Sequence, residues 1–136
     1  MTSDDLTAGE PTRREVRFVV LRHCVSRNDV HFDLMVDSGD AMATWRCPEA
    51  PETASGAAMT CEKLADHRRR YLEYEGPLSQ NRGDVRRHDG GYCRLLAAGD
   101  GVWQIAFRGT RLRGEYELSS LDQDRRFWSL RPRAPR

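Results

Sequence analysis

Apolar and polar side chains alternate along several short stretches of this chain, and turn-forming residues separate these stretches. The alternation at 16–22, 31–37 and 102–108 has the two-residue period of a β-strand. The sequence Asp-Ser-Gly-Asp at 37–40 and Asp-Gly at 100–101 are typical of hairpin turns. Further strands are expected at 42–45, 92–98, 111–113, 115–119 and 127–130. No long stretch has the 3.6-residue apolar period of a helix. The pattern predicts an all-β fold: a small closed or partly open β-barrel with irregular loops and little helix.

The same pattern gives the domain organisation. Residues 1–14 are polar and are expected to form a disordered N-terminal lead. Residues 15–131 are expected to form a single β-barrel domain, and 132–136 a mobile basic tail. Within the domain the stretch 49–82 is the least regular, because Gly56, Gly76 and Pro77 interrupt it. A length of 136 residues suits one domain with its own core.

Composition narrows the class of protein. The chain is 38% hydrophobic and 32% charged, and its apolar runs are too short to cross a membrane. The polar start does not resemble an export signal, so a cytoplasmic location is expected. Four cysteines stand far apart without a Cys-x-x-Cys pair: Cys24, Cys47, Cys61 and Cys93. In a reducing compartment they are expected to be small apolar core or strand residues rather than disulfides or zinc ligands.

Charge is distributed unevenly although the net charge is only +1. Residues 1–66 carry 7 basic and 12 acidic side chains, whereas residues 67–136 carry 15 basic and 9 acidic ones. All the basic residues except Lys63 are arginines, whose planar guanidinium suits phosphate. The distribution is compatible with a phosphate-bearing partner, and a GC-biased genome explains the arginine content equally well.

Two histidines and an aspartate form the first candidate site. His31 and Asp33 are two residues apart, so their side chains share one face of a strand. His23 ends the preceding strand, and a short connection at 24–30 can return the chain beside it. Two imidazoles and one carboxylate can bind Mn²⁺, Fe²⁺ or Zn²⁺ and leave positions open for water and substrate. The alternative is that each histidine is a surface or capping residue without a ligand.

Two basic segments form the second group of candidates. Asp66-His67 is followed by Arg68, Arg69, Arg70 and Tyr71, where an anion could be held and a proton delivered. The segment 81–87 contains Gly83, which could let backbone N–H groups approach an anion. The usual alternative for such charge runs is a solvated surface. The candidate phosphate-binding or nucleic-acid-binding residues are Arg68, Arg82, Arg86 and Arg87.

The order of these motifs resembles one protein family. The motifs are a strand ending in His23, the triplet His31-Phe32-Asp33, Trp45 with Pro48, Asp66-His67 with Tyr71, and Glu75-Gly76. Closing strands at 112–118 and 128–130 complete the order. The combination resembles the 3′-phosphoesterase domain of DNA ligase D, the bacterial end-joining ligase, together with its free-standing relatives. The resemblance extends over about residues 16–131 and implies that 15–131 form a single phosphoesterase-like β-barrel domain.

The resemblance implies a β-barrel with a groove and a role for each motif. His23, His31 and Asp33 would bind a catalytic Mn²⁺, with Zn²⁺ or another divalent ion as alternatives. His67 would contact the scissile phosphate as a catalytic residue, and Tyr71 would support the same pocket. The family removes a terminal ribonucleoside and then the 3′-phosphate from DNA ends in non-homologous end-joining repair. The implied partners are DNA 3′ ends of a primer-template and a separate ligase or polymerase, with no membrane.

Two departures from the family pattern open a second hypothesis. The ligase-associated domains have arginine two residues after the metal-binding aspartate, where this chain has Met35. A second phosphate-binding arginine aligns with Met59. Loss of both contacts favours a non-catalytic module of the same fold that binds DNA ends or a repair partner. The intact set of His23, His31, Asp33 and His67 favours the metal-dependent phosphoesterase.

Overall fold

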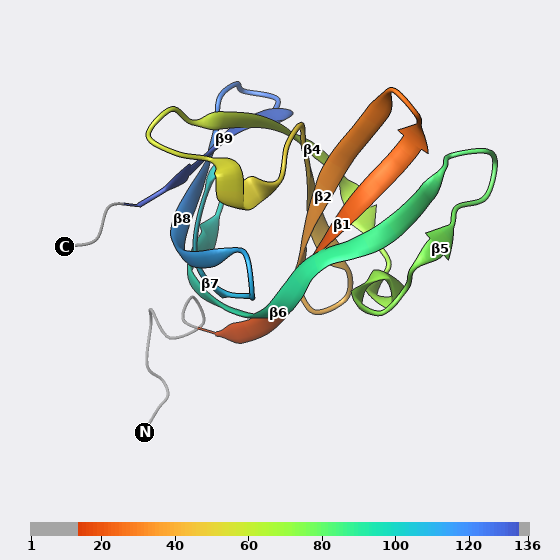
Figure 1. Cartoon of the computed structure of the whole chain (residues 1–136). Helices are drawn as coiled ribbons and strands as arrows, with labels where there is room; N and C mark the ends of the chain where they lie inside the picture. Colours follow the sequence, from red (N-terminus) through yellow and green to blue (C-terminus); the bar gives the residue numbers. More distant parts are fainter. Residues whose placement is uncertain (1–13, 134–136) are drawn as a thin grey trace.

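The computed structural model describes residues 14–133 and consists almost entirely of antiparallel strands (Figure 1). The strands are β1 (Glu15–Ser26), β2 (Asp29–Asp37), β3 (Met42–Cys47), β4 (Met59–His67), β5 (Gly76–Pro77), β6 (Asp84–Gly99), β7 (Val102–Arg108), β8 (Arg113–Ser120) and β9 (Phe127–Pro132). The helical turns are the 3₁₀ segments η2 (Pro51–Thr53) and η3 (Arg69–Leu72). Of the N-terminal lead predicted at 1–14, residues 1–13 lie outside the described residues. Of the tail predicted at 132–136, residues 134–136 lie outside the described residues.

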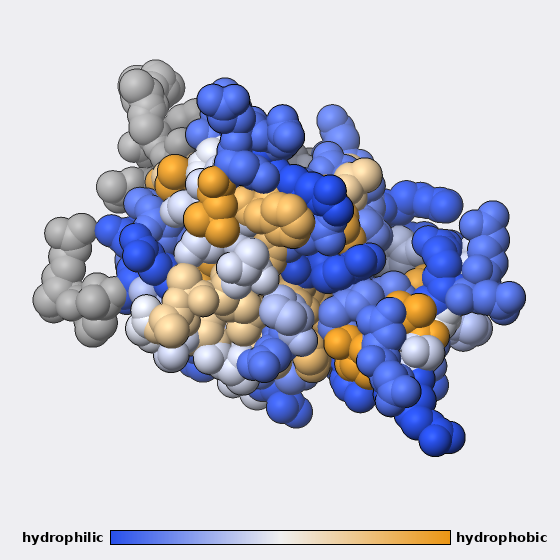
Figure 2. Space-filling model, turned by 90° about the horizontal axis from the view of Figure 1, so that it is seen from above, coloured by the Kyte–Doolittle hydropathy of each residue, from blue (hydrophilic) through white to orange (hydrophobic). Residues whose placement is uncertain are grey.

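Eight of the strands close into a barrel. The order β1-β2-β3-β4-β9-β8-β7-β6 returns to the start because β6 also pairs with β1, and β5 adds a short pairing to β6. The prediction of an all-β barrel is therefore confirmed. In the described part of the chain, no helix is long and apolar enough to cross a membrane. Seen from above in Figure 2, hydrophilic side chains separate several small apolar patches.

Several element boundaries differ from the sequence-based prediction. The strand β4 falls inside the stretch that was expected to be irregular; most of its residues are only partly buried, so it lacks clear apolar alternation. The strand β6 starts eight residues before the predicted 92–98, because Gly90 and Gly91 lie within the strand rather than in a turn. The strand predicted at 111–113 is mostly a turn, and β8 begins at Arg113.

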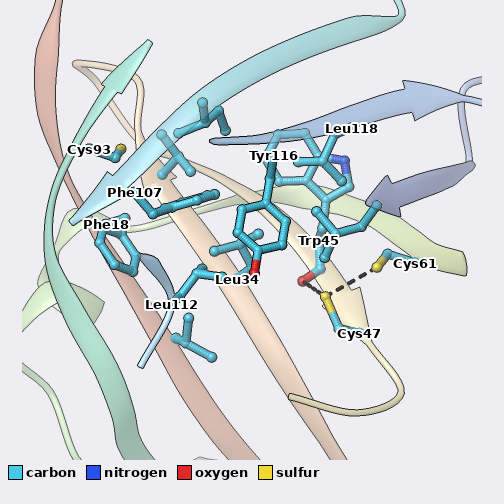
Figure 3. Close-up of a cluster of buried hydrophobic side chains, with 14 of the residues drawn as sticks. Phe18, Leu34, Trp45, Cys47, Cys61, Cys93, Phe107, Leu112, Tyr116 and Leu118 are labelled. Atoms are coloured by element: carbon cyan, nitrogen blue, oxygen red, sulfur yellow. Dashed lines mark hydrogen bonds between the residues drawn. The ribbon is translucent and has the colours of Figure 1, made fainter. Parts of the chain in front are cut away.

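The interior of the barrel is an apolar and aromatic core. Figure 3 shows Phe18, Phe107 and Tyr116 close together beside Leu34, with Trp45 farther along the core. The rings of Phe18 and Phe107 meet edge to face at 4.9 Å, a favoured aromatic arrangement. Every second side chain of β1 and β2 points into this core. The alternate side chains of these strands point to the outer side of the barrel.

The cysteines are free thiols, as the sequence indicates. Cys47, Cys61 and Cys93 are buried in the core, whereas Cys24 is a half-buried strand residue. The sulfur atoms of Cys47 and Cys61 lie 3.2 Å apart across β3 and β4 (Figure 3). Burial raises the pKa of Cys93 to about 12, so its thiol stays protonated at neutral pH.

A second, smaller apolar cluster covers the outer side of β1 and β2. Val19 and Leu21 of β1 and Met35 of β2 pack there against Leu72 of η3. Tyr71, Tyr74 and Leu78 add partly buried contacts. The segment from the end of β4 through β5 therefore lies over the outside of the barrel and creates a second layer there.

A buried carboxylate holds the turn between β7 and β8. Asp89 of β6 accepts hydrogen bonds from the backbone N–H groups of Thr110, Arg111 and Leu112 at 3.0, 2.9 and 2.7 Å. Burial alone would raise the pKa of Asp89, but these bonds, led by that of Leu112, hold it below its ordinary value. Asp89 thus tethers a turn that closes the barrel.

We predict that Asp89→Asn lowers the free energy of unfolding at pH 7 by about 1–3 kcal/mol, because the amide cannot accept all three bonds. Because the pKa of Asp89 is lower in the folded than in the unfolded protein, its ionised carboxylate stabilises the fold above the unfolded pKa of about 3.9. This stabilisation is lost as the pH falls through the pKa of the folded protein. The difference between variant and wild type should therefore shrink in acid. Urea denaturation at pH 7 and in acid measures both effects, with the exposed Asp124→Asn as control. Equal stability of Asp89→Asn and wild type at pH 7 would contradict the tether.

Candidate functional site

The pairing of β1 with β2 assembles the predicted histidine and aspartate cluster. His23 lies directly opposite His31, and Leu21 lies opposite Asp33. Alternation along the two strands puts His23, His31 and Asp33 on the outer face, opposite to the barrel core. All three residues are nevertheless buried, with 8%, 7% and 3% of their surface exposed.

The polar atoms of the cluster converge on one point. His31 Nε2 is 2.9 Å from His23 Nδ1, and His23 Nδ1 is 3.2 Å from Asp33 Oδ2. The second carboxylate oxygen, Oδ1, is 3.5 Å from His31 Nε2. One ligand atom from each residue can be chosen so that all lie within 4.8 Å of one another.

Outer contacts hold both imidazoles in this orientation. His23 Nε2 donates a hydrogen bond of 2.7 Å to the carbonyl oxygen of Arg82, which turns Nδ1 toward the cluster. His31 Nδ1 lies 3.7 Å from the carboxylate of Asp29, which turns Nε2 inward. Oxygen partners on the outer nitrogen are typical of histidines whose other nitrogen binds a metal.

The electrostatics of the cluster fit a cation. The hydrogen bond to Asp33 raises the pKa of His23 against the effect of burial, whereas burial lowers the pKa of His31. Asp33 Oδ1 is buried without a hydrogen-bond partner among the described residues. Two imidazole nitrogens and a carboxylate therefore lie close together, with more lone pairs than N–H donors among them. This set of ligand atoms suits a divalent transition metal.

A cavity of about 360 Å³ opens over the cluster. It lies on the outer side of the barrel, between β1 to β3 and the covering segment. Its lining includes His23, His31, Asp33, His67, Tyr71 and Arg82. The structure thus brings the two predicted catalytic residues to the same cavity as the predicted metal ligands.

The two predicted catalytic residues are held beside each other. His67 ends β4, and its Nδ1 donates a hydrogen bond of 2.9 Å to the carbonyl oxygen of Ala65, leaving Nε2 for a ligand. Tyr71 belongs to η3, and its ring lies edge to face with His67 at 5.8 Å. Arg70 lies over the ring of Tyr74 at 4.5 Å and extends this aromatic row.

The four predicted phosphate-binding arginines are less well grouped. Arg82 lines the cavity, with its guanidinium bonded to Ser79. Arg68, Arg86 and Arg87 do not line it. Arg87 instead donates to the carbonyl oxygen of Leu72 at 3.0 Å, and Arg86 lies 3.9 Å from the carboxylate of Asp84.

Two charged residues of the cavity, Asp29 and Arg46, were missed by the sequence analysis. Asp29 orients His31, and Arg46 enters the cavity from β3, where it pairs with Asp33 in the strand register. No motif marks either residue. The alternation of β3 indicates which face Arg46 occupies, but the pairing register is needed to set it beside Asp33. Of the two methionines that the resemblance aligns with arginines, Met35 lines the cavity and Met59 does not.

The fold and the cavity define a small antiparallel β-barrel with a histidine and aspartate cluster on its outer face. A model of the DNA ligase D 3′-phosphoesterase domain family matches residues 22–120, which contain every residue of the cluster. The chain belongs to this family, which connects it with DNA end processing in repair. No curated protein matches the chain.

Gly83 allows the loop between β5 and β6 to approach β1. It has a φ of +87°, and a Cβ added there would lie 2.0 Å from the carbonyl oxygen of Cys24 and 2.7 Å from the Cα of Val25. The sequence analysis proposed that this glycine exposes N–H groups to an anion. The structure shows a close backbone contact at this glycine, which keeps the Arg82 carbonyl against His23.

We predict that Gly83→Ala destabilises the protein by at least about 1 kcal/mol and releases the His23 ring, because neither backbone can move away easily. Urea denaturation measures the first effect, and the ¹⁵N resonances of the His23 imidazole measure the second. Gly56→Ala is the matched control, since a Cβ there meets nothing within 4 Å. Unchanged His23 resonances in Gly83→Ala would contradict this role.

Proposed function

We propose that the protein is a Mn²⁺-dependent phosphoesterase that trims 3′-phosphate or 3′-ribonucleotide ends of DNA. The observation that carries the proposal is the convergence of His23, His31 and Asp33 in a cavity that His67 also lines. Family membership supports the substrate class. A binding surface alone does not require a buried set of metal ligands facing a histidine.

The residues divide into two groups across the cavity. His23 Nδ1, His31 Nε2 and one oxygen of Asp33 would hold the ion. When bound, Mn²⁺ supplies Lewis-acid polarisation of a phosphate oxygen. Asp29 and the Arg82 carbonyl keep the imidazoles in register, and the apolar side chains of Leu21, Met35 and Val85 limit water around the ligands.

His67 is suited to phosphate binding and proton transfer. Its Nδ1 hydrogen is engaged by Ala65, so a protonated ring presents Nε2–H to a ligand in the cavity. In monoester hydrolysis water adds to phosphorus and the bond between phosphorus and O3′ breaks. His67 gives its Nε2 proton to O3′, and the protons of the attacking water stay on the released phosphate, which leaves a 3′-OH and free phosphate. Tyr71 holds the ring of His67 through its edge-to-face contact.

A second candidate function is a non-catalytic module that binds DNA ends. Met35 favours it, because an apolar side chain with 1% exposure occupies the wall of the cavity where related domains place an arginine. Loss of a charge-assisted hydrogen bond to phosphate weakens the binding free energy by about 1.5–3 kcal/mol. The two candidates differ in whether any Mn²⁺-dependent trimming occurs.

We predict that the wild-type protein binds Mn²⁺ and that Asp33→Ala abolishes binding, because the carboxylate is the only anionic ligand of the cluster. Isothermal titration calorimetry with MnCl₂ measures this. Cys24→Ala is the control: it changes a neighbouring β1 residue outside the cavity and should bind Mn²⁺ as wild type does. If the Asp33→Ala variant binds Mn²⁺ as tightly as wild type, the ion is held elsewhere.

We further predict that the protein converts a primer-template with a 3′-phosphate to a 3′-OH when Mn²⁺ is present. His67→Ala should reduce the rate by about 10²-fold or more, because it removes the proton donor. Met35→Arg should raise the rate, because it adds a phosphate donor to the cavity wall. Electrophoresis of labelled primers with and without Mn²⁺ measures the three proteins. If neither wild type nor Met35→Arg trims the end, the binding module replaces the phosphoesterase.

A further inference from the structure

Arg46 stands at the junction of two cavities. It lines the cavity over the metal-ligand cluster and also a neighbouring cavity of about 350 Å³. His31 and Asp29 line both cavities as well, so the two share a wall of charged and polar side chains. A group bound at Arg46 would therefore lie beside the cluster and still connect to the second cavity.

The side chain of Arg46 lacks a partner within the described residues. Its Nε–H is buried and donates to no acceptor in residues 14–133, and no ion pair of these residues includes its guanidinium. The strand register puts two carboxylates opposite it, Asp33 on β2 and Glu62 on β4. Asp33 pairs with the two histidines instead, and Glu62 pairs with Arg126 at 3.0 Å.

An unpaired guanidinium next to a cavity is suited to an anion. Burying a polar group without a partner is unfavourable, and a phosphate would satisfy the N–H groups of Arg46 with charge-assisted hydrogen bonds. The planar fork of guanidinium can engage two phosphate oxygens at once. The neighbouring Met35 offers no hydrogen-bond donor on the adjacent strand.

We propose that Arg46 binds the terminal phosphate of the DNA 3′ end and supplies from β3 the contact that Met35 does not supply from β2. The inference deepens the proposed function and rests on it for the identity of the ligand. Arg46 is a substrate-binding residue in this assignment. The competing interpretation is that Arg46 serves the fold alone, as a positive charge between Asp33 and Glu62.

The test compares binding of two DNA ends by fluorescence anisotropy. Labelled primer-templates ending in 3′-phosphate or 3′-OH are titrated with protein in the absence of divalent ions, so that no turnover is expected. Wild type should bind the 3′-phosphate end more tightly. Arg46→Gln should reduce this preference roughly tenfold to a hundredfold, because it removes a charge-assisted contact. Arg46→Lys should retain part of the preference, since it keeps the charge without the fork.

Two further variants separate a specific contact from general charge. Arg94→Gln removes an exposed arginine of β6 that lies nine residues, about 30 Å of strand, from the cavity residue Val85. It should keep the wild-type preference. Met35→Arg added to Arg46→Gln should restore the preference, because it returns a guanidinium to the same cavity.

The outcomes distinguish this inference from the proposed function. If Arg46→Gln melts at a lower temperature but keeps the full preference for the 3′-phosphate, Arg46 serves the fold and the inference is overturned. If the wild type shows no preference, the inference is also overturned. Should Arg46→Gln not fold, Arg46→Lys decides: a reduced preference supports the inference and an unchanged one overturns it. Trimming with Mn²⁺ by the wild type and by Met35→Arg is measured separately. Its absence in both rejects the phosphoesterase, while the binding data still decide the role of Arg46.

Discussion

The register between β1 and β2 is the constraint on which the site depends. Side chains alternate across a strand, so a slip of one residue would exchange the inner and outer faces of β2. Phe18, Val20 and Leu34 hold this register because they must face the barrel core. The same register sets His23 opposite His31 and leaves Asp33 beside them. The apolar core thus orients polar groups that it does not contact.

Barrel closure strengthens this constraint from the other side. β1 pairs with β6 as well as β2, and His23 lies opposite Val85 in that second pairing. The residues just before β6 include Arg82 and Gly83, whose backbone packs against the end of β1. One imidazole is therefore positioned by two neighbouring strands and one loop, and the position of the ligand cluster follows from closure of the whole barrel.

The parts of the site that could be predicted are those that depend on local spacing. His31 and Asp33 share a face because they are two residues apart, and His23 reaches them through a short connection. The overall β-barrel also follows from short alternating stretches. The stretch 49–82 is different: its strand β4 has few buried residues, so the sequence there shows little apolar periodicity. Its path is determined by long-range pairing of β4 with β3 and β9.

Charge along the sequence was a poor guide to the direction of a side chain. Arg68, Arg86 and Arg87 belong to conspicuous basic runs, yet they do not line the cavity. Arg46 has the uncharged neighbours Trp45 and Cys47 in the sequence, and the pairing of β3 with β2 is needed to place it beside Asp33. A run of arginines indicates local charge density, whereas a binding site requires convergence of side chains from separate strands.

The energetics of Asp33 and Arg46 connect the fold with its chemistry. Both residues bury a polar atom without a hydrogen-bond partner among residues 14–133, and each such atom is unfavourable by about 1–3 kcal/mol. They lie opposite each other in the strand pair, so a direct ion pair would relieve both at once. Asp33 is instead drawn to the two histidines, which leaves a cation and an electron-rich cluster side by side in one cavity. The proposed ligands, a metal ion and a phosphate, would match this separation of charge: the cation would bind the cluster and the anion would bind Arg46.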